Sequence, residues 1–324
     1  MDMRKDDSLM ALKVRPDERG GVGAMGLMQG KRGLVMGVAN DHSIAWGIAK
    51  VLRAHGAELA FTYQGEALGK RVAPLAQSLG SDLVLPCDVE DIASVDAVFD
   101  ALDRDWSGLD FVVHAIAFSD KNELKGRYAD TTRENFTRTL LISCFSFTEI
   151  AKRAAARMSA GGAMITLTFG GSTRVMPNYN VMGVAKAALE ASVRYLAADL
   201  GADDIRVNAI SAGPVRTLAG AGIADARLMF SYQKAHSPLR RSVSVEDIGG
   251  SALYLLSDLS RGVTGEIHHV DSGYNIISMP RPQVLKAQDE AGVTGKKRLV
   301  RDDFSSSRHP ALPPCLSMIF SENR

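Results

Sequence analysis

Tyr179 and Lys186 are the two residues whose types and spacing most clearly suggest chemistry. Both lie in a helical pattern that runs to about Leu200. Because an α-helix turns once every 3.6 residues, positions seven apart share one face and lie about 10.5 Å apart along the axis. An ammonium there can hold a ribose, and a phenol can donate a hydrogen bond or a proton to an oxyanion forming on a substrate. Taken alone, the pair is better explained as a surface lysine and a helix-starting tyrosine that happen to align.

The first predicted strand and helix enclose a turn that could bind phosphate. An apolar run over 34–38 predicts a buried strand, and it leads into a helix over 43–52 that Ser43 can cap. The spacing is Gly37-x5-Ser43-x3-Gly47 rather than GxGxxG. Gly37 permits the turn, Ser43 can hydrogen-bond phosphate, and Gly47 lets the helix pack close to the sheet. The free N–H groups at the helix N-terminus would favour the pyrophosphate of a dinucleotide.

Further candidate ligand-binding residues follow later predicted strands. Gln64 follows the second strand, Asp88 the third and Ile116 the fourth. Open α/β sheets bind ligands at these strand ends, so the coincidence carries more weight than any single residue. Gln64 is neutral where an acidic residue commonly holds the ribose diol, so charge does not decide between NAD and NADP. Lys70 and Arg71 could meet a 2′-phosphate, although a solvated helix face explains them better.

Apolar strands and amphipathic helices alternate along the chain, and these elements must position the candidate residues. Residues 217–238 form a segment of mixed pattern, to which neither a helix nor a strand is assigned. Strands are predicted over 34–38, 57–62, 82–86, 109–115, 163–168, 205–210 and 266–270, and helices over 43–52, 67–79, 93–105, 133–158, 179–200 and 245–257. This alternation predicts an α/β fold with one doubly wound parallel sheet of about seven strands, covered by helices on both faces.

Composition narrows the class of protein. With 324 residues, 46% of them hydrophobic, the chain can bury the core of one large α/β domain. A net charge of +1 gives no field that would attract nucleic acid or an anionic membrane. Cys87, Cys144 and Cys315 lie far apart without a CxxC pair, so we expect neither a metal site nor a disulfide framework. With no membrane-length apolar run and no secretory signal, we expect a cytoplasmic protein.

Both ends of the chain differ in composition from its centre. Residues 1–29 are polar and contain glycine, and Met25 or Met28 could be an alternative start. Residues 280–324 combine prolines, a charged run and loop-type composition. Since neither segment offers much apolar surface to bury, we expect two disordered tails around one domain over 30–279.

Taken together, the motifs resemble those of bacterial enoyl-acyl-carrier-protein reductases, within the short-chain dehydrogenase/reductase superfamily. The resemblance rests on the Gly/Ser spacing of the first turn, the Tyr-x6-Lys pair, and the runs PNYNVMG (177–183) and VNAISAGP (207–214). It covers about 27–277, and its most specific part is Tyr-x6-Lys, because most of the superfamily uses Tyr-x3-Lys. It implies a Rossmann-type domain, usually a homotetramer, that reduces an enoyl chain on acyl carrier protein with NADH, or alternatively NADPH.

The longer tyrosine–lysine spacing suits enoyl reduction. In ketone reduction, hydride and proton go to adjacent atoms. In enoyl-thioester reduction, hydride goes to the β-carbon and negative charge collects on the thioester oxygen, three bonds away. Moving the tyrosine three residues further from the lysine keeps it on the same face and shifts it by about 4.5 Å. Stabilising that enolate oxygen is the largest electrostatic task of such a site.

The resemblance also implies roles for individual residues. Tyr179 and Lys186 would be catalytic, with Lys186 on the nicotinamide ribose, and Ser119 would meet the substrate. A lid over the acyl chain would include Leu218, Ile223, Met229 and Phe230. The implied cofactor-binding residues are Gly37, Ser43, Ile44, Gln64, Asp88, Val89, Ile116, Lys186, Val215, Arg216, Thr217, Leu218 and Ala219.

Phe169 departs from the family pattern, which typically has a second tyrosine ten residues before the catalytic one. Phenylalanine keeps the ring and removes the hydroxyl, which Thr166 or Thr168 could supply instead. Two alternatives to an active enoyl reductase therefore stay open. One is a weakly active or non-catalytic NAD-binding paralogue, and the other is a superfamily reductase with a different substrate. The Tyr-x6-Lys spacing argues against a 3-oxoacyl reductase.

Overall fold

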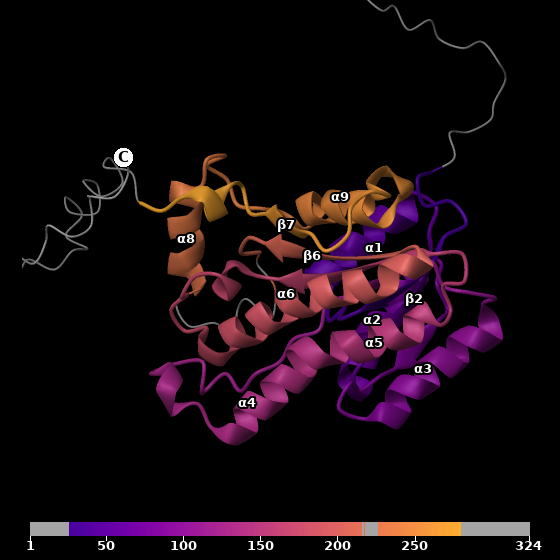
Figure 1. The fold of residues 1–324 in the computed structure, drawn as a ribbon, viewed down its shortest axis with the longest axis horizontal. Coiled ribbons are helices and arrows are strands. Elements are labelled where there is room, and N and C mark those ends of the chain that lie inside the picture. The colour runs from indigo at the N-terminus through magenta and orange to yellow at the C-terminus, as the bar shows by residue number, and fades with distance from the viewer. Residues whose placement is uncertain (1–25, 216, 218–225, 280–324) are drawn as a thin grey trace, which may run out of the picture. The chain divides into compact units, whose positions relative to one another are not determined.

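A sheet of seven parallel strands lies at the centre of the described part of the chain (Figure 1). The structure is a computed structural model that describes residues 26–215, 217 and 226–279. The strands pair in the order β3-β2-β1-β4-β5-β6-β7, and every pair is parallel. They are β1 (Arg32–Met36), β2 (Glu58–Tyr63), β3 (Val84–Pro86), β4 (Phe111–His114), β5 (Gly162–Thr168), β6 (Ile205–Ala212) and β7 (Ile267–Val270).

Helices cover both faces of this sheet, which confirms the predicted doubly wound, Rossmann-like fold. Val35 packs with one group of helices, whereas its neighbours Leu34 and Met36 pack with the other, so β1 is buried on both faces. Figure 1 shows α1 and α9 on one side of the strands and α5 and α6 on the other. The first group is α1 (Ile44–Ala54), α2 (Gly65–Ser78) and α9 (Val245–Leu256), and the second is α3 (Ile92–Asp105), α5 (Ser146–Ala155) and α6 (Asn180–Leu200).

Predicted and observed element boundaries agree within two residues, with one exception. The helix predicted over 133–158 is instead α4 (Arg133–Leu140), a π-helix (Leu141–Phe145) and α5, which ends at Ala155. A π-turn, with its i→i+5 hydrogen bonds, leaves no clear mark in the apolar periodicity on which the prediction rested. In the mixed segment, the structure shows α8 (Ala226–His236).

Gly47 has a different neighbour from the one predicted. A Cβ added at Gly47 would lie 2.6 Å from the Cβ of Val245, at the start of α9. A Cβ added at Gly249 would lie 2.6 Å from Cγ2 of Val51 on α1. The two glycines therefore let α1 approach α9, and the predicted close contact of Gly47 with the sheet is wrong.

The folded domain begins before the predicted boundary at residue 30. Met28 is fully buried in the core, and its N–H donates to the carbonyl oxygen of His55 at 2.9 Å. Residues 26–29 therefore pack with the domain rather than with the predicted tail. The rest of the two predicted tails, 1–25 and 280–324, lies outside the described residues. In the part of the chain that is described, no helix combines the length and apolarity needed to cross a membrane.

Candidate active site

A cavity of about 390 Å³ opens at the C-terminal ends of β1, β4, β5 and β6. The chain runs outward from β1 to β2 and β3 on one side, then returns to β4 on the other. The cavity thus lies at the switch point of the sheet, where α/β folds bind their ligands.

The β1–α1 turn has the shape of a phosphate cradle. Gly37 has a φ of +95°, and an added Cβ would lie 2.1 Å from the carbonyl oxygen of Ala115, so only glycine fits. α1 begins at Ile44 with no acidic residue in its first turn, so its free N–H groups and dipole can accept an anion. Gly37 and Ile44 both line the cavity. These features fit the pyrophosphate of a dinucleotide.

Ser43 also lines the cavity, but its hydroxyl has partners within the turn. The Oγ donates to the carbonyl oxygen of Asn40 at 2.5 Å and accepts from the N–H of Ala39 at 3.3 Å. Ser43 is the N-cap residue of α1 without a side-chain capping bond to the helix. In this structure the hydroxyl therefore shapes the loop ahead of α1.

Tyr179 and Lys186 reach the same cavity from the start of α6. Both side chains are buried, with 8% and 5% of their surfaces exposed. The Lys186 Nζ donates to the carbonyl oxygen of Leu167 on β5 at 2.7 Å. Burial lowers the pKa of Lys186 to about 8, and burial together with Glu190 raises the pKa of Tyr179 above its usual value. At neutral pH the pair is therefore mainly an ammonium and a neutral phenol.

Glycines near the N-terminus of α6 let the chain pack closely around Tyr179. A Cβ added at Gly171 would lie 2.5 Å from Cδ1 of Tyr179, and one at Gly183 would lie 2.8 Å from the carbonyl oxygen of Gly171. The Phe169 ring lies edge-on to the Tyr179 ring, with centroids 5.2 Å apart and planes at 66°. Tyr179 is thus held between a short glycine turn and an aromatic ring.

A buried polar layer lies behind this pair. Thr168 lines the cavity and donates through Oγ1 to Glu190 Oε1 at 2.7 Å. Thr166 instead contacts His114 Nδ1 at 3.1 Å, and burial lowers the pKa of His114 to about 3, so that ring is neutral. Thr166 does not line the cavity, which leaves Thr168 as the better-placed candidate for a substitute hydroxyl. Glu190 was not among the residues predicted from the sequence, although its position four residues after Lys186 on one face of α6 was an available signal.

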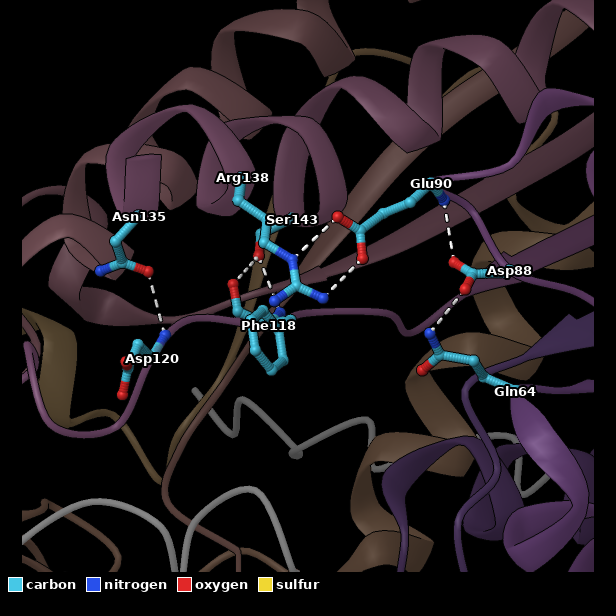
Figure 2. A network of polar contacts seen from close by, with 8 residues as sticks. All are labelled: Gln64, Asp88, Glu90, Phe118, Asp120, Asn135, Arg138 and Ser143. Carbon is cyan, nitrogen blue, oxygen red and sulfur yellow. Dashed lines mark hydrogen bonds and ion pairs between the residues drawn. The ribbon is translucent and has the colours of Figure 1, made fainter. Parts of the chain in front are cut away.

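The residues predicted to bind the adenosine half of the dinucleotide divide into those that line the cavity and those that do not. Ile116 lines the cavity, whereas Gln64, Asp88 and Val89 do not and follow the neighbouring strands β2 and β3. Gln64 Nε2 donates to Asp88 Oδ2 at 3.0 Å, and the N–H of Glu90 donates to Asp88 Oδ1 at 3.0 Å (Figure 2). The Asp88 carboxylate therefore has a fixed orientation at this end of the sheet.

Several of the remaining predicted residues also line the cavity. Ser119 lines the cavity, where its hydroxyl donates to Asn135 Oδ1 at 3.3 Å and accepts from Thr139 Oγ1 at 3.0 Å. Other lining residues from the predicted sets are Val215, Thr217, Met229 and Phe230. Outside the described residues are Arg216, Leu218, Ala219 and Ile223.

Comparison with known proteins identifies the family. The family model described as "Enoyl-(Acyl carrier protein) reductase" matches residues 37–275, which include every part of this cavity. The chain belongs to the enoyl-acyl-carrier-protein reductase family. The resemblance inferred from the motifs is thereby confirmed.

Relatives of this reductase family match the chain over most of its length. Enoyl-[acyl-carrier-protein] reductase [NADH] 2 of Rhizobium meliloti is 77% identical over 264 residues, which are 82% of this chain and 98% of that protein. The crystal structure of FabI from Candidatus Liberibacter asiaticus has a TM-score of 0.78 and 64% identity, covering 79% of this chain and 100% of that one. The Anaplasma phagocytophilum reductase, solved in complex with NAD, has a TM-score of 0.77 and 59% identity, covering 79% and 98%.

Proposed function

We propose that this member of the enoyl reductase family transfers hydride from NADH to the β-carbon of a trans-2-enoyl thioester on acyl carrier protein, in fatty acid elongation. The observation that carries the proposal is the buried Tyr179–Lys186 pair at the switch-point cavity, with Tyr179 as the N-cap residue of α6 and Lys186 within the helix. The names of its relatives, which specify NADH and acyl carrier protein, support the cofactor and the carrier.

Several described residues would hold the dinucleotide, which supplies the hydride when bound. Gly37, Ile44 and the N-terminus of α1 would face the pyrophosphate, with Ser43 fixing the loop before the helix. Gln64, Asp88, Val89 and Ile116 would serve the adenosine half, and the Asp88 carboxylate would disfavour an additional 2′-phosphate. The nicotinamide side would meet Val215 and Thr217, together with Arg216, Leu218 and Ala219.

Lys186 would hold the nicotinamide ribose. Its ammonium has three N–H groups, and one donates to Leu167, which leaves two for ribose hydroxyls. The same positive charge favours the negative charge that develops on the substrate nearby. Lys186 would therefore act in both binding and electrostatic stabilisation.

Tyr179 would act on the thioester oxygen. As hydride adds to the β-carbon, negative charge collects on that oxygen, and the phenol donates a hydrogen bond or its proton to it. Because the pKa of Tyr179 is raised, the hydroxyl stays protonated over the physiological range. The edge-on Phe169 ring would restrict the Tyr179 ring and supply packing beside the thioester.

We further propose that the protein works as a homotetramer in the cytoplasm. Support for assembly comes from exposed aromatic side chains on neighbouring helices of one face, Phe145 and Tyr195. Large apolar groups on a surface favour burial against another chain. Light scattering of the purified protein measures the number of subunits directly, and a monomeric mass contradicts this part of the proposal.

Oxidation of NADH and NADPH in the presence of crotonyl and longer enoyl thioesters tests the reaction. We expect NADH to be oxidised with enoyl thioesters and not with 3-oxoacyl thioesters. An inactive protein that still binds NADH would instead be the non-catalytic paralogue. Activity only on a different carbonyl or enoyl compound would identify a superfamily reductase with another substrate.

The two catalytic residues are predicted to differ in what their loss affects. Lys186→Ala should weaken NADH binding, measured by fluorescence or calorimetry, because the ribose loses its donor. Tyr179→Phe should spare NADH binding and lower the rate of reduction, because only the oxyanion loses its donor. Equal effects of the two substitutions on cofactor affinity would rule out this division of roles.

A further inference from the structure

Phe118 lies on a wall shared by two cavities. One is the active-site cavity, and the second, of about 530 Å³, is lined by segments 118–123 and 132–138. Phe118 is 41% exposed, and among the described residues that line the second cavity it alone is apolar. An acyl thioester passing this wall would find its apolar contact in the Phe118 ring.

The backbone of Phe118 is fixed by the π-helix. The N–H of Phe118 donates to Ser143 Oγ at 2.9 Å, and the Ser143 hydroxyl donates to the carbonyl oxygen of Phe118 at 2.9 Å (Figure 2). Ser143 is itself fully buried. These two bonds define the position of the Phe118 backbone and leave the ring to be oriented by another group.

That group is Arg138, which lies in α4, five residues before Ser143. Its guanidinium carbon lies 4.5 Å from the centroid of the Phe118 ring. Its Nε and Nη2 donate to the two carboxylate oxygens of Glu90 at 2.8 and 2.7 Å (Figure 2). A guanidinium held by a bidentate carboxylate keeps a fixed plane, and a fixed plane suits stacking on an aromatic ring.

We propose that Arg138 is a positioning residue for the acyl substrate: held by Glu90, it fixes the Phe118 ring at the wall that the thioester passes. This inference rests on the proposed enoyl reductase function. Arg138 acts through Phe118, so its loss should weaken substrate binding more than it slows the chemical step. The other groups of the second cavity support a rigid wall, since Glu123 accepts from Thr132 and Asn135.

Arg157 offers a matched control. Its Nε and Nη2 donate to the two carboxylate oxygens of Asp103 at 2.7 and 2.6 Å, and its guanidinium carbon lies 4.9 Å from the Phe99 ring. Phe99 is buried in the core and lines neither of the two cavities. Arg157→Ala therefore removes the same kinds of interaction away from the substrate path.

Steady-state kinetics of the full chain test the proposal. Arg138→Ala should raise KM for the enoyl thioester about five- to tenfold, because the substrate would then meet a Phe118 ring that is no longer held in one orientation. The kcat and the Kd for NADH should change by less than about twofold, and Arg157→Ala should leave KM unchanged. In a Phe118→Leu background, Arg138→Ala should raise KM further by less than about twofold, because the aromatic ring that Arg138 orients is already absent.

Equal KM effects of Arg138→Ala and Arg157→Ala would overturn the proposal, as would full additivity of the Arg138→Ala and Phe118→Leu effects on KM.

A readout independent of activity is the ¹⁹F resonance of para-fluorophenylalanine placed at position 118. Arg138→Ala should shift and narrow this resonance, and an unchanged resonance in an active enzyme overturns the positioning role alone. A wild type that reduces no enoyl thioester overturns the proposed function and the substrate role with it.

Discussion

At the scale of single residues, Lys186 combines a positive charge with burial. Its pKa falls from 10.5 to about 8 in the folded protein, so the folded state binds this proton less tightly than the unfolded chain. The charged side chain therefore lowers the free energy of unfolding at every pH below about 8. This penalty fades as pH rises from about 8 towards 10.5, because only the unfolded chain still binds the proton there, and binding it becomes less favourable as pH rises.

Lys186→Met should accordingly stabilise the protein while removing its activity. We expect the free energy of unfolding at pH 7 to rise by roughly 1–3 kcal/mol, after allowing for the unpaired Leu167 carbonyl. Urea unfolding of the cofactor-free protein at pH 7 and pH 9.5 measures the difference, which should shrink at the higher pH. Lys50→Met, on an exposed surface pair with Glu246, is the control and should show no such trend. A gain that is the same at both pH values would contradict the explanation by charge burial.

Phe169 is the residue at which this chain differs from the family pattern. A donor aimed at developing charge contributes roughly 3–4 kcal/mol, whereas an ordinary assisting hydroxyl contributes about 1–1.5 kcal/mol. We therefore expect an active wild-type enzyme, and we expect Phe169→Tyr to change turnover by about tenfold or less.

The comparison requires wild type, Phe169→Tyr and Tyr179→Phe on the same enoyl thioester. Tyr179→Phe should show by far the largest loss. If wild type were inactive and Phe169→Tyr strongly active, the assisting role would be wrong and the non-catalytic interpretation would gain support.

At the scale of elements, the close approach of α1 and α9 depends on glycine. Gly47→Ala would place its Cβ 2.6 Å from the Cβ of Val245, a backbone-proximal atom that cannot move freely. We expect a loss of about 1–3 kcal/mol in the free energy of unfolding, as for other overpacked positions. The matched control is Gly250→Ala in α9, where an added Cβ meets nothing within 4 Å and helix propensity alone should stabilise by up to about 1 kcal/mol. Equal urea midpoints for the two variants would refute the packing argument.

Elements were predictable from sequence where local pattern determines them. The strands carry short runs rich in apolar residues between turn signals, and so β1 to β7 were found within two residues. That Tyr179 and Lys186 reach one cavity was expected from their spacing on a predicted helix, although Tyr179 is the N-cap residue of α6 rather than part of its regular helix.

The local sequence pattern did not reveal contacts between segments that lie far apart in the chain. Glu90 and Arg138 lie 48 residues apart, and no periodicity relates them. Gly47 was known to permit a close contact, but its partner on α9 depends on tertiary packing. The turn-shaping bonds of Ser43 likewise depend on how the loop folds.

At the scale of the whole molecule, the sheet, the apolar cores and the active-site cavity are built from residues between 26 and 279. We therefore predict that a fragment spanning residues 25–282 folds and binds NADH like the full chain. A fragment spanning 30–282 is the control, since it lacks Met28, whose burial contributes about 2 kcal/mol. Thermal unfolding and NADH titration compare the three proteins. Loss of soluble protein from the 25–282 fragment would contradict the prediction.

The π-helix at Leu141–Phe145 has a consequence for how such a protein can change over generations. It is one extra residue accommodated within a helix, and each residue turns a helix by about 100°. Arg138 and Ser143 contact Phe118, which lines the active-site cavity, whereas Phe147 and Ile150 pack in the core. A gain or loss of a single codon at this point would rotate Arg138 and Ser143 relative to Phe147 and Ile150 in a single step. Changes of length, as well as substitutions, are thus a route by which a lineage could alter the substrate wall while keeping its core.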